Sequence, residues 1–443
     1  MGKKLLRFGK FAGLMLLCIV GLFIVLVVWP LNYFKYPEQE YSVMIIDNVS
    51  VIDVEKESVF HNRVVVIRNG IIEKITDTSF KYQGKGNEKV KRIHAKGQFL
   101  LPALWDMHVH LTKQSPHIAY PAFISYGIIH VRDMRGAYTE RDPFTGVQSR
   151  LEKWNREVEN QKLIGPRLHS FTSFAIEGPN EMFKGKPSFF NCATPIDAVN
   201  LVQYLKKQNV TLIKVYNNIP REAFFALMLE ANKLGIDVAG HKPLRVSTIE
   251  ASNSGMKSLE HAKFFIWDSY PMAESIRKLS NPSKTENTVL RKNMLEKHDS
   301  ILLQEMFTTF KKNNTWYCPT HLTRKQDAFA GEDTFRAKYA DINPVLRFIS
   351  FEDLDATIKE DTTALAKEVY RDIYLKGLQI SVSAYKNGVK ILAGSDVPEL
   401  PGSSLHDELR ELSKAGLSNF EVLRTATLYP AQYYKFFVCP GSS

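Results

Sequence analysis

The sequence predicts an α/β protein: a (β/α)8 TIM barrel with a small flanking β-sandwich domain and an N-terminal transmembrane helix. Short apolar, β-branched segments alternate with helical patterns along most of the 443 residues, and such alternation is typical of a parallel sheet with helical crossovers. Several of these segments end in a histidine, lysine or aspartate. The chemistry of a TIM barrel lies at the carboxyl ends of its strands, so this placement favours a barrel with a site at its mouth.

Composition narrows the class of protein. Hydrophobic residues make up 44% of the chain and charged residues 24%, which is ordinary for a globular protein. The formal net charge is +11, but no long lysine and arginine run carries interleaved aromatic residues, so we expect no nucleic-acid binding. The four cysteines are scattered without a CxxC pair, which argues against a disulfide framework and against zinc held by thiolates.

The N-terminus predicts a membrane anchor. Residues 1–10 form a basic flank, and residues 11–31 are a charge-free, mostly apolar run of the roughly 20 residues that span a bilayer. The positive flank predicts a cytoplasmic N-terminus and a periplasmic or extracellular catalytic domain. A cleaved signal peptide is the alternative, but no small-x-small cleavage site follows the run.

Residues 32–40 read as a linker, and residues 41–100 as a partial β-sandwich domain. The strand-like runs VMIIDNVSVID and RVVVIRNGIIEKI carry Asn69-Gly70, which is a hairpin signal between β-branched segments. Residues 101–438 are the predicted barrel. Its eight strands are expected in the segments LWDMHVH, IIHVRDM, RLHSFTSF, LIKVY, DVAGHK, KSLEH, TWYCPT and KILAGSD.

Helices are expected between these strands, for example at Pro220 to Leu234, with another at Asn419 to Thr427 after the last strand. Three connections are long: residues 137–166, 265–314 and 321–388. Long connections at a barrel mouth are candidates for substrate lids, and extra helices packed on the outside are the other interpretation.

The polar strand ends predict a metal centre. His108 and His110 are two residues apart in an extended segment, so both imidazoles point to one face and can reach one ion. Lys214 lies inside a strand of β-branched residues. Burying an ammonium group there would cost on the order of several kcal/mol unless the group is paired or neutralised. Three further strand-like segments end at His241, His261 and Asp396.

These motifs together resemble the amidohydrolase superfamily of metal-dependent hydrolases, in its imidazolonepropionase-like and prolidase-like branch. The supporting stretches run from about Val43 to Tyr434 in the order LLPALWDMHVHL, GIIHVRDMRG, IKVY, AGHKP, LEHAK, AGSDVP and ATLYPAQ. The resemblance implies two divalent metal ions. Zinc suits imidazole and carboxylate donors, while manganese and cobalt remain open.

The resemblance also implies a role for each ligand. His108 and His110 would bind the more buried ion, and a carboxylated Lys214 would bridge both ions. Asp396 would bind metal and shuttle a proton. The second ion would be held by His241 and His261.

The function expected from this resemblance is hydrolysis of an amide bond in a small substrate, with a dipeptide as first choice, by a metal-bridging hydroxide. A cyclic amidohydrolase of imidazolonepropionase type is the enzymatic alternative, although that type normally needs one metal and no bridging lysine. From another class, the chain could be a non-catalytic, membrane-anchored envelope protein on a truncated hydrolase scaffold.

Two side chains are candidates for substrate binding. Tyr216 shares a strand face with Lys214 and could hydrogen-bond a substrate carbonyl or carboxylate. Arg132, beside Asp133, either binds a substrate carboxylate or forms a salt bridge at the end of its strand. We also expect a β-sandwich without its C-terminal strands, because the chain stops at Ser443 where related chains continue. An open sheet edge can pair with a partner, so a homo-oligomer is possible on this pattern.

Overall fold

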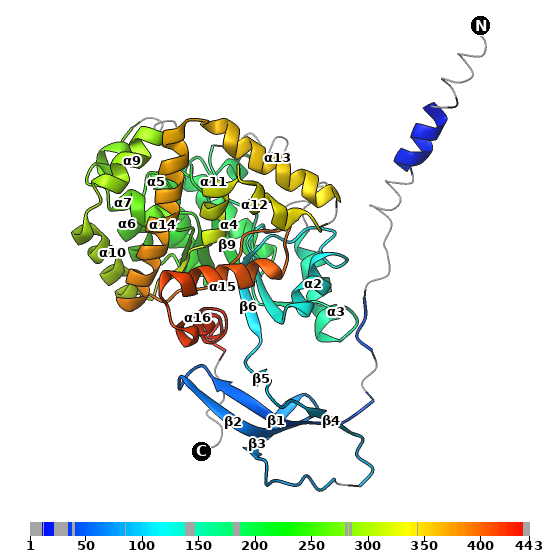
Figure 1. Cartoon of the computed structure of the whole chain (residues 1–443). Coiled ribbons are helices and arrows are strands. Elements are labelled where there is room, and N and C mark those ends of the chain that lie inside the picture. Colours follow the sequence, from blue (N-terminus) through cyan, green and yellow to red (C-terminus); the bar gives the residue numbers. More distant parts are fainter. Residues whose placement is uncertain are drawn as a thin grey trace.

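The N-terminal strands form a five-stranded sheet that lies below a larger α/β body in the computed structural model (Figure 1). The structure describes residues 11, 13–21, 34–37, 40–84, 86–137, 147–179, 187–279, 282, 286–342 and 344–436. The sheet contains β1 (Val43–Asp53), β2 (Ser58–Arg68), β3 (Ile71–Asp77), β4 (Val90–His94) and β5 (Phe99–Leu100). Strands β1, β2 and β3 pair antiparallel, whereas β4 and β5 run parallel to β1.

The predicted hairpin joins β2 to β3. Asn69 and Gly70 have φ angles of 49° and 80°, and two central residues with positive φ are what a two-residue hairpin of matching twist requires. All five strands of this sheet come from residues 43–100, and the residues beyond 436 lie outside the described part of the chain.

The α/β body contains two parallel sheets. One has the order β6 (Leu104–Val109), β7 (Ile128–Asp133) and β8 (Arg167–Leu168); the other contains β9 (Leu212–Val215), β10 (Asp237–Gly240), β11 (Ser258–Glu260) and β12 (Trp316–Cys318). Every residue of β6, β9, β11 and β12 is buried. Continuous burial explains why these strands read as apolar runs without alternation, since helices cover parallel sheets.

Single bridges and backbone hydrogen bonds connect the two sheets. Thr172 and Ile176 form parallel bridges to Leu212 and Val215 of β9. At the other end, Ile391 bridges to Tyr317 of β12. The same segment returns to β6, because Ala393 O accepts from Met107 N at 2.9 Å and His108 O accepts from Asp396 N at 2.9 Å. Hydrogen bonds therefore lead from β6 through β12 and back to β6.

Helices follow most of the parallel strands (Figure 1). Three of them begin with a capping box, in which a serine or threonine and an acidic residue three positions later satisfy the first free N–H groups: Thr194/Asp197, Ser247/Glu250 and Ser418/Glu421. The described helices are α2 (Ala119–Ser125), α3 (Gln148–Glu159), α4 (Pro195–Lys207), α5 (Arg221–Leu234), α6 (Thr248–Asn253), α7 (Lys263–Asp268), α8 (Ala273–Arg277), α9 (Thr288–Glu296), α10 (Ser300–Asn313), α11 (His321–Phe329), α12 (Asp333–Arg336), α13 (Pro344–Glu360), α14 (Ala364–Lys386), α15 (Ser403–Ala415), α16 (Asn419–Thr425) and α17 (Leu428–Tyr433).

The hydrophobic core lies between the parallel strands and these helices. Its largest cluster joins β9 and β10 to α4, α5, α7, α10 and α14. A second cluster joins β6 and β7 to α2, α3 and α15. The two longest predicted connections, residues 265–314 and 321–388, are helical as expected; they contain most of α7 with α8–α10, and α11–α14.

The predicted transmembrane anchor at residues 11–31 is wrong. Within the described part of the chain, no helix combines the length and apolar character that crossing a membrane demands. The basic flank 1–10 and residues 12 and 22–31 lie outside the described residues. The single-pass localisation inferred from the anchor is withdrawn with it.

Candidate metal centre

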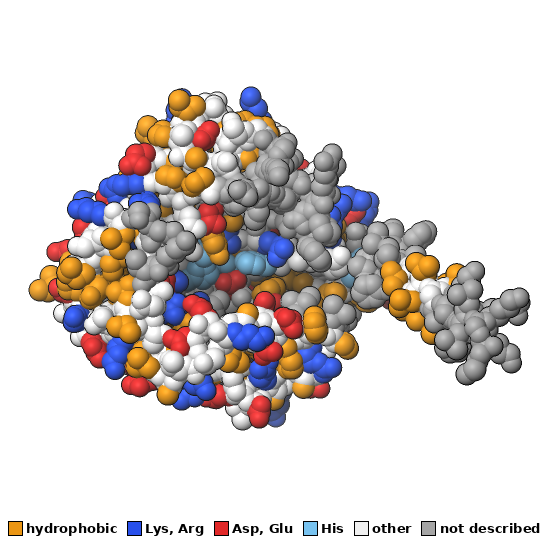
Figure 2. Space-filling model, turned by 90° about the horizontal axis from the view of Figure 1, so that it is seen from above, with side chains coloured by type: hydrophobic (Ala, Val, Ile, Leu, Met, Phe, Trp, Pro, Cys, Tyr) orange, Lys and Arg blue, Asp and Glu red, His pale blue; other side chains and the backbone are white. Residues whose placement is uncertain are grey.

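The predicted ligands lie together at the carboxyl ends of the parallel strands. His108 is on β6 and His110 follows it, while His241 and His261 come directly after β10 and β11. Asp396 ends the segment that bridges β12 to β6. Figure 2 shows histidine and acidic side chains at the floor of a hollow on this face, with lysine or arginine side chains beside it.

Three histidines surround the Asp396 carboxylate. Nε2 of His108 and Nε2 of His110 lie 3.5 Å and 3.3 Å from Oδ1. Nδ1 of His261 lies 3.7 Å from Oδ2, and Nε2 of His261 lies 2.8 Å from Nε2 of His241. The structure therefore brings all four predicted histidines and the aspartate into one cluster.

The second ring nitrogen of three histidines has a protein partner. Nδ1 of His108 lies 3.0 Å from Oε2 of Glu260, and Nδ1 of His241 lies 3.0 Å from Oδ1 of Asn217. Nδ1 of His261 lies 2.7 Å from Oγ1 of Thr320. Such contacts fix the tautomer and the orientation of a metal-binding imidazole. In His108 and His241 they leave Nε2 as the nitrogen that faces the cluster, whereas Nδ1 of His261 also lies 3.7 Å from Asp396.

The cluster fits a divalent metal ion. Nε2 of His108 and Nε2 of His110 are buried and have no hydrogen-bond partner among the described residues. Burial lowers the pKa of both histidines well below its usual value, and the positive charge of Lys214 lowers it further. Neutral imidazole is the metal-binding form. One donor atom from each of His108, His110 and Asp396 lies within 4.8 Å of the others, so ligands of suitable chemistry converge on one point.

Lys214 is buried in β9, with 4% of the residue exposed. Its Nζ donates to the carbonyl oxygen of Met134 at 2.5 Å. Burial lowers the pKa of the amine, while Asp396, Glu260 and Asp133 act against that change. Burial therefore shifts this lysine toward its neutral form, which is the nucleophilic form of lysine.

Burial also raises the pKa of Asp396 to about 7, an effect that the charges of Lys214 and Arg324 oppose. A carboxyl group with this pKa can both accept and release a proton near neutral pH. The residue before Asp396 is anchored to Asp106. Ser395 N and Ser395 Oγ donate to the buried Asp106 carboxylate at 2.9 Å and 2.6 Å. Asp106 also accepts from His108 N at 3.1 Å, so it links the two ligand-bearing segments.

Two of the ligands have a left-handed backbone. The φ angle is 73° at His261 and 52° at Asp396, a conformation that few residues other than glycine adopt. Such strained residues concentrate at functional sites. Close backbone approach is required at Gly394, where an added Cβ would lie 2.7 Å from Cβ of His108 and 2.6 Å from Sγ of Cys318. Local conformation is therefore set to aim these side chains at the cluster.

The two predicted substrate-binding residues have different surroundings. The ring of Tyr216 lies 3.9 Å from the ring of His241, measured between centroids, which places it at the cluster. Arg132 is fully buried, and Nη2 donates to both carboxylate oxygens of Glu260 at 2.8 Å. Its Nε donates to Met107 O at 2.6 Å. Arg132 thus forms the salt bridge that was its alternative role, with Glu260 as partner in place of Asp133.

Sequence reasoning missed the residues that orient the ligands. Glu260 directly precedes His261, and the period-2 pattern of β11 puts it on the same face as Ser258, whose Oγ donates to it at 2.6 Å. Two polar residues on one face of this short strand, directly before His261, were a usable signal. Asn217 and Thr320 lie in loops, where no periodicity reveals which way a side chain points.

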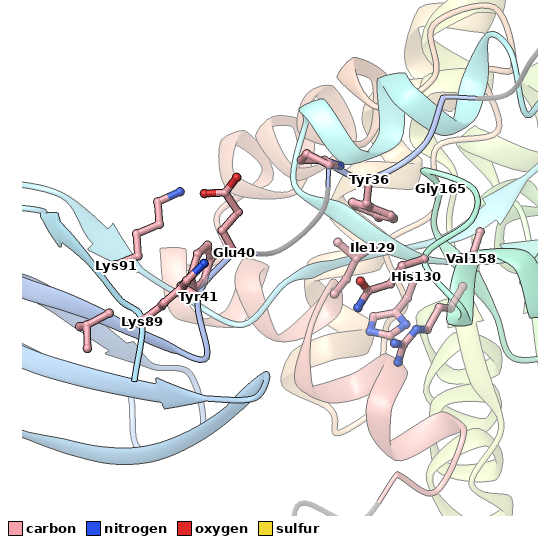
Figure 3. A pocket seen from close by; sticks show the side chains of 13 residues that line it. Tyr36, Glu40, Tyr41, Lys89, Lys91, Ile129, His130, Val158 and Gly165 are labelled. Atoms are coloured by element: carbon pink, nitrogen blue, oxygen red, sulfur yellow. The ribbon is translucent and has the colours of Figure 1, made fainter. Parts of the chain in front are cut away.

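A large cavity lies away from the cluster, at the other end of β7. It has a volume of about 900 Å³ and is lined by Lys89, Lys91, Tyr41, Ile129 and His130 among others. Figure 3 shows the first three on the side of the five-stranded sheet and the last two on the side of the α/β body. None of the predicted metal ligands lines this cavity.

Comparison with protein-family models and with curated proteins finds no match. Solved structures do match. They include the bottromycin amidohydrolase (TM-score 0.61, 19% identity, covering 89% of this chain and 78% of that chain). A Xaa-Pro dipeptidase with bound methionine in its active site has a TM-score of 0.58 at 18% identity, with 89% of each chain covered.

The ochratoxinase of A. niger is also similar, with a TM-score of 0.53 at 16% identity, covering 89% of this chain and 85% of that chain. At these identities the likeness concerns the fold. The resemblance drawn from the motifs is therefore confirmed at that level: this chain is similar in structure to amidohydrolase-type proteins.

Proposed function

We propose that this chain is a metal-dependent hydrolase of the amidohydrolase superfamily that cleaves an amide bond in a small substrate, with a dipeptide as first choice. The observation that carries the proposal is the convergence of four neutral histidines and one carboxyl group at strand ends, with two buried Nε2 atoms unpartnered within the described residues. The likeness to a Xaa-Pro dipeptidase and to the bottromycin amidohydrolase supports the choice of an amide substrate.

We infer that the two parallel sheets and residues 390–396 are a closed (β/α)8 barrel. Support comes from the bridges that join residues 172 and 176, which follow β8, to β9 and that join Ile391 to β12, and from the hydrogen bonds that return this segment to β6. We likewise propose residues 41–100 as a partial β-sandwich domain and residues from 101 to about 438 as the barrel domain. In a barrel the cluster would lie where TIM-barrel chemistry takes place.

The residues of the cluster divide naturally between two divalent ions. His108, His110 and Asp396 would hold one, and His241 and His261 the other. Ions in this site would polarise the substrate carbonyl and lower the pKa of water. Zinc suits the imidazole and carboxylate donors.

Lys214 would bridge the two groups as a carboxylated lysine. The neutral amine adds to carbon dioxide, forms a new N–C bond and loses a proton, and the product is an anionic carbamate with two oxygen donors. This change replaces a costly buried ammonium with a group that the cluster can use. The lowered pKa of Lys214 and its position near His108 and His110 support this assignment.

The other side chains would move protons and orient ligands. Asp396 would accept a proton from the attacking water at a carboxylate oxygen and return it to the leaving nitrogen. Glu260 would hold His108 in the tautomer with a free Nε2. Tyr216, next to His241, would donate its hydroxyl hydrogen to an oxygen of the substrate.

The test combines metal analysis with a substrate panel. The purified full-length chain should contain about two divalent ions, lose activity with a chelator and regain it with zinc. It should hydrolyse dipeptides in preference to cyclic amides such as imidazolone propionate. The double variant His108→Asn/His110→Asn should lose both metal and activity while the exposed-site variant His94→Gln keeps them. A metal-free, inactive wild-type chain would leave the non-catalytic alternative.

A further inference from the structure

A crevice leads away from the metal cluster between α7, α9, α11 and α14. Its inner part is lined by His241, His261, Lys242 and Asn217, and its outer part by Arg291, Arg324 and Tyr370. Lys263, Trp267 and Glu286 line both parts, so the two parts adjoin at these residues. The water-sized space amounts to about 40 Å³ and 20 Å³ respectively, enough for a small polar group but not for a whole dipeptide.

Trp267 leaves a hydrogen-bond donor unused in this crevice. The residue is 6% exposed, and its Nε1 is buried with no hydrogen-bond partner among the described residues. A buried indole N–H usually finds an acceptor, and an unpaired one has a free-energy cost. An occupant of the crevice that accepts a hydrogen bond would remove that cost.

The charged groups of the crevice also have spare donors. Arg291 is well paired: its Nε donates to Glu286 Oε1 at 3.0 Å and its Nη1 to Tyr370 OH at 2.7 Å. Lys263 has only a long contact, 3.7 Å, to that same oxygen of Glu286. Because Arg291 already occupies this oxygen at a shorter distance, the Lys263 ammonium remains available to a second acceptor.

Arg324 is similarly available. Its Nη1 lies 2.6 Å from Asp327 on the same helix, and its Nε lies 3.4 Å from Thr323 Oγ1, which engages only part of a guanidinium with five N–H donors. Its side chain is 22% exposed. Arg324 lines the outer part of the crevice together with Lys263 and Trp267.

We propose that this crevice is the subsite for a carboxylate of the substrate, held by Trp267 Nε1, Lys263 and Arg324 beside the histidines that face the scissile bond. The three groups are donors only, and two of them are cations, so an anion that offers two acceptor oxygens satisfies all of them. A neutral amide offers a single acceptor oxygen to these three donors, where a carboxylate offers two. That the bound carboxylate belongs to a substrate rests on the proposed function. The binding of a carboxylate in the crevice does not.

The binding test uses the indole signals of the full-length chain. Its five tryptophans give five Nε1–H resonances in a ¹H–¹⁵N spectrum, and the Trp267→Phe variant identifies the one from Trp267. Butyrate, as a simple carboxylate probe, should shift that resonance in metal-loaded and in chelator-treated protein alike, whereas butyramide should not. The Arg324→Gln variant should weaken the butyrate titration about tenfold or more. A Trp267 resonance that ignores butyrate, or responds equally to butyramide, overturns the subsite.

The kinetic test compares one dipeptide with its C-terminal amide. Wild-type kcat/KM should favour the free acid about tenfold or more, and the preference should shrink in Trp267→Phe and Arg324→Gln through KM. The control variants Trp154→Phe, a buried tryptophan of α3, and Arg410→Gln, an exposed cation of α15, should keep it. Hydrolysis without this preference removes the subsite and leaves the proposed function standing. A butyrate-specific shift without any hydrolysis supports the carboxylate subsite and contradicts the proposed function.

Discussion

Nδ1 of His108 lies 3.0 Å from Oε2 of Glu260, next to the cluster of histidines and Asp396. The carboxylate is itself held by Arg132, whose Nη2 contacts both of its oxygens at 2.8 Å. Glu260 therefore reaches His108 in a fixed orientation and as an acceptor. The ring must donate from Nδ1, and Nε2 is left with its lone pair toward the cluster.

Replacing Glu260 with glutamine should lower metal affinity by about 10- to 100-fold, because the amide is a weaker acceptor and removes the partner charge of Arg132. Metal titration against a competing chelator measures the effect. Glu332→Gln, which alters a more exposed carboxylate paired with Arg371, is the control. Breaking the buried pair also destabilises the fold by about 3–5 kcal/mol, so thermal unfolding should be recorded alongside. Unchanged affinity in a folded Glu260→Gln protein contradicts the orienting role.

If Lys214 bridges two ions as proposed, replacing it with alanine should remove one ion and most of the activity, because the bridging carbamate would be lost. Short-chain carboxylic acids should restore part of both, since a small carboxylate can enter the space that the side chain vacates. Metal content and turnover with and without added propionate provide the readout. A Lys214→Ala protein with full metal and full turnover rules out the bridge.

Asparagine at position 396 keeps the size of the side chain and one oxygen ligand but removes the proton acceptor. We expect metal content close to that of the wild type and a fall in kcat of about 10²-fold or more. Metal analysis must precede the kinetics, so that a loss of ions is not mistaken for a loss of proton transfer. Wild-type turnover by the loaded Asp396→Asn protein would exclude Asp396 from the chemistry.

The paired histidines His130 and His169 should make stability depend on pH. Their rings are joined by a 2.7 Å contact between Nδ1 of His130 and Nε2 of His169, and Trp105 stacks on His130 with centroids 4.0 Å apart. Burial lowers the pKa of His130 to about 3 and that of His169 to about 4. Below about pH 6.5, the ordinary pKa of histidine, these two side chains therefore bind protons in the unfolded chain but stay neutral in the folded chain.

This contribution to stability is fully present above about pH 6.5 and is lost as the pH falls toward 4 and 3. Urea unfolding at pH 7 and pH 5 should show a smaller decrease for His169→Gln than for the wild type. His94→Gln, at an exposed side chain of β4, should keep the wild-type decrease. Equal decreases in all three proteins would show that the pair does not titrate between the two states as described.

The ligands of the cluster could be predicted from sequence because strand periodicity and strand ends are local features. His108 and His110 follow from a spacing of two, and His241, His261 and Asp396 from their positions just after apolar runs. The hairpin at Asn69-Gly70 was predictable for the same reason, since the positive φ angles that its turn requires fall on two adjacent residues. The binding of metal by these residues and their roles in catalysis stay predictions.

The partners of these ligands depend on contacts between distant segments. Glu260 meets His108 across 152 positions of sequence, and Asp106 meets Ser395 across 289, so neither pair leaves a local pattern. The membrane anchor failed for a different reason. The hydropathy of a segment does not establish that it forms a continuous helix, and no helix of the described residues is long and apolar enough to cross a membrane.

The left-handed backbone at His261 and Asp396 has a consequence for how the site can be dissected. A residue with a Cβ pays about 1–2 kcal/mol in that conformation, and asparagine, aspartate and histidine bear it best. Alanine scanning would therefore confound the loss of a ligand with a local change of backbone at these two positions. Asparagine is the replacement that best tolerates the left-handed backbone conformation, and it should be the default at 261 as well as at 396.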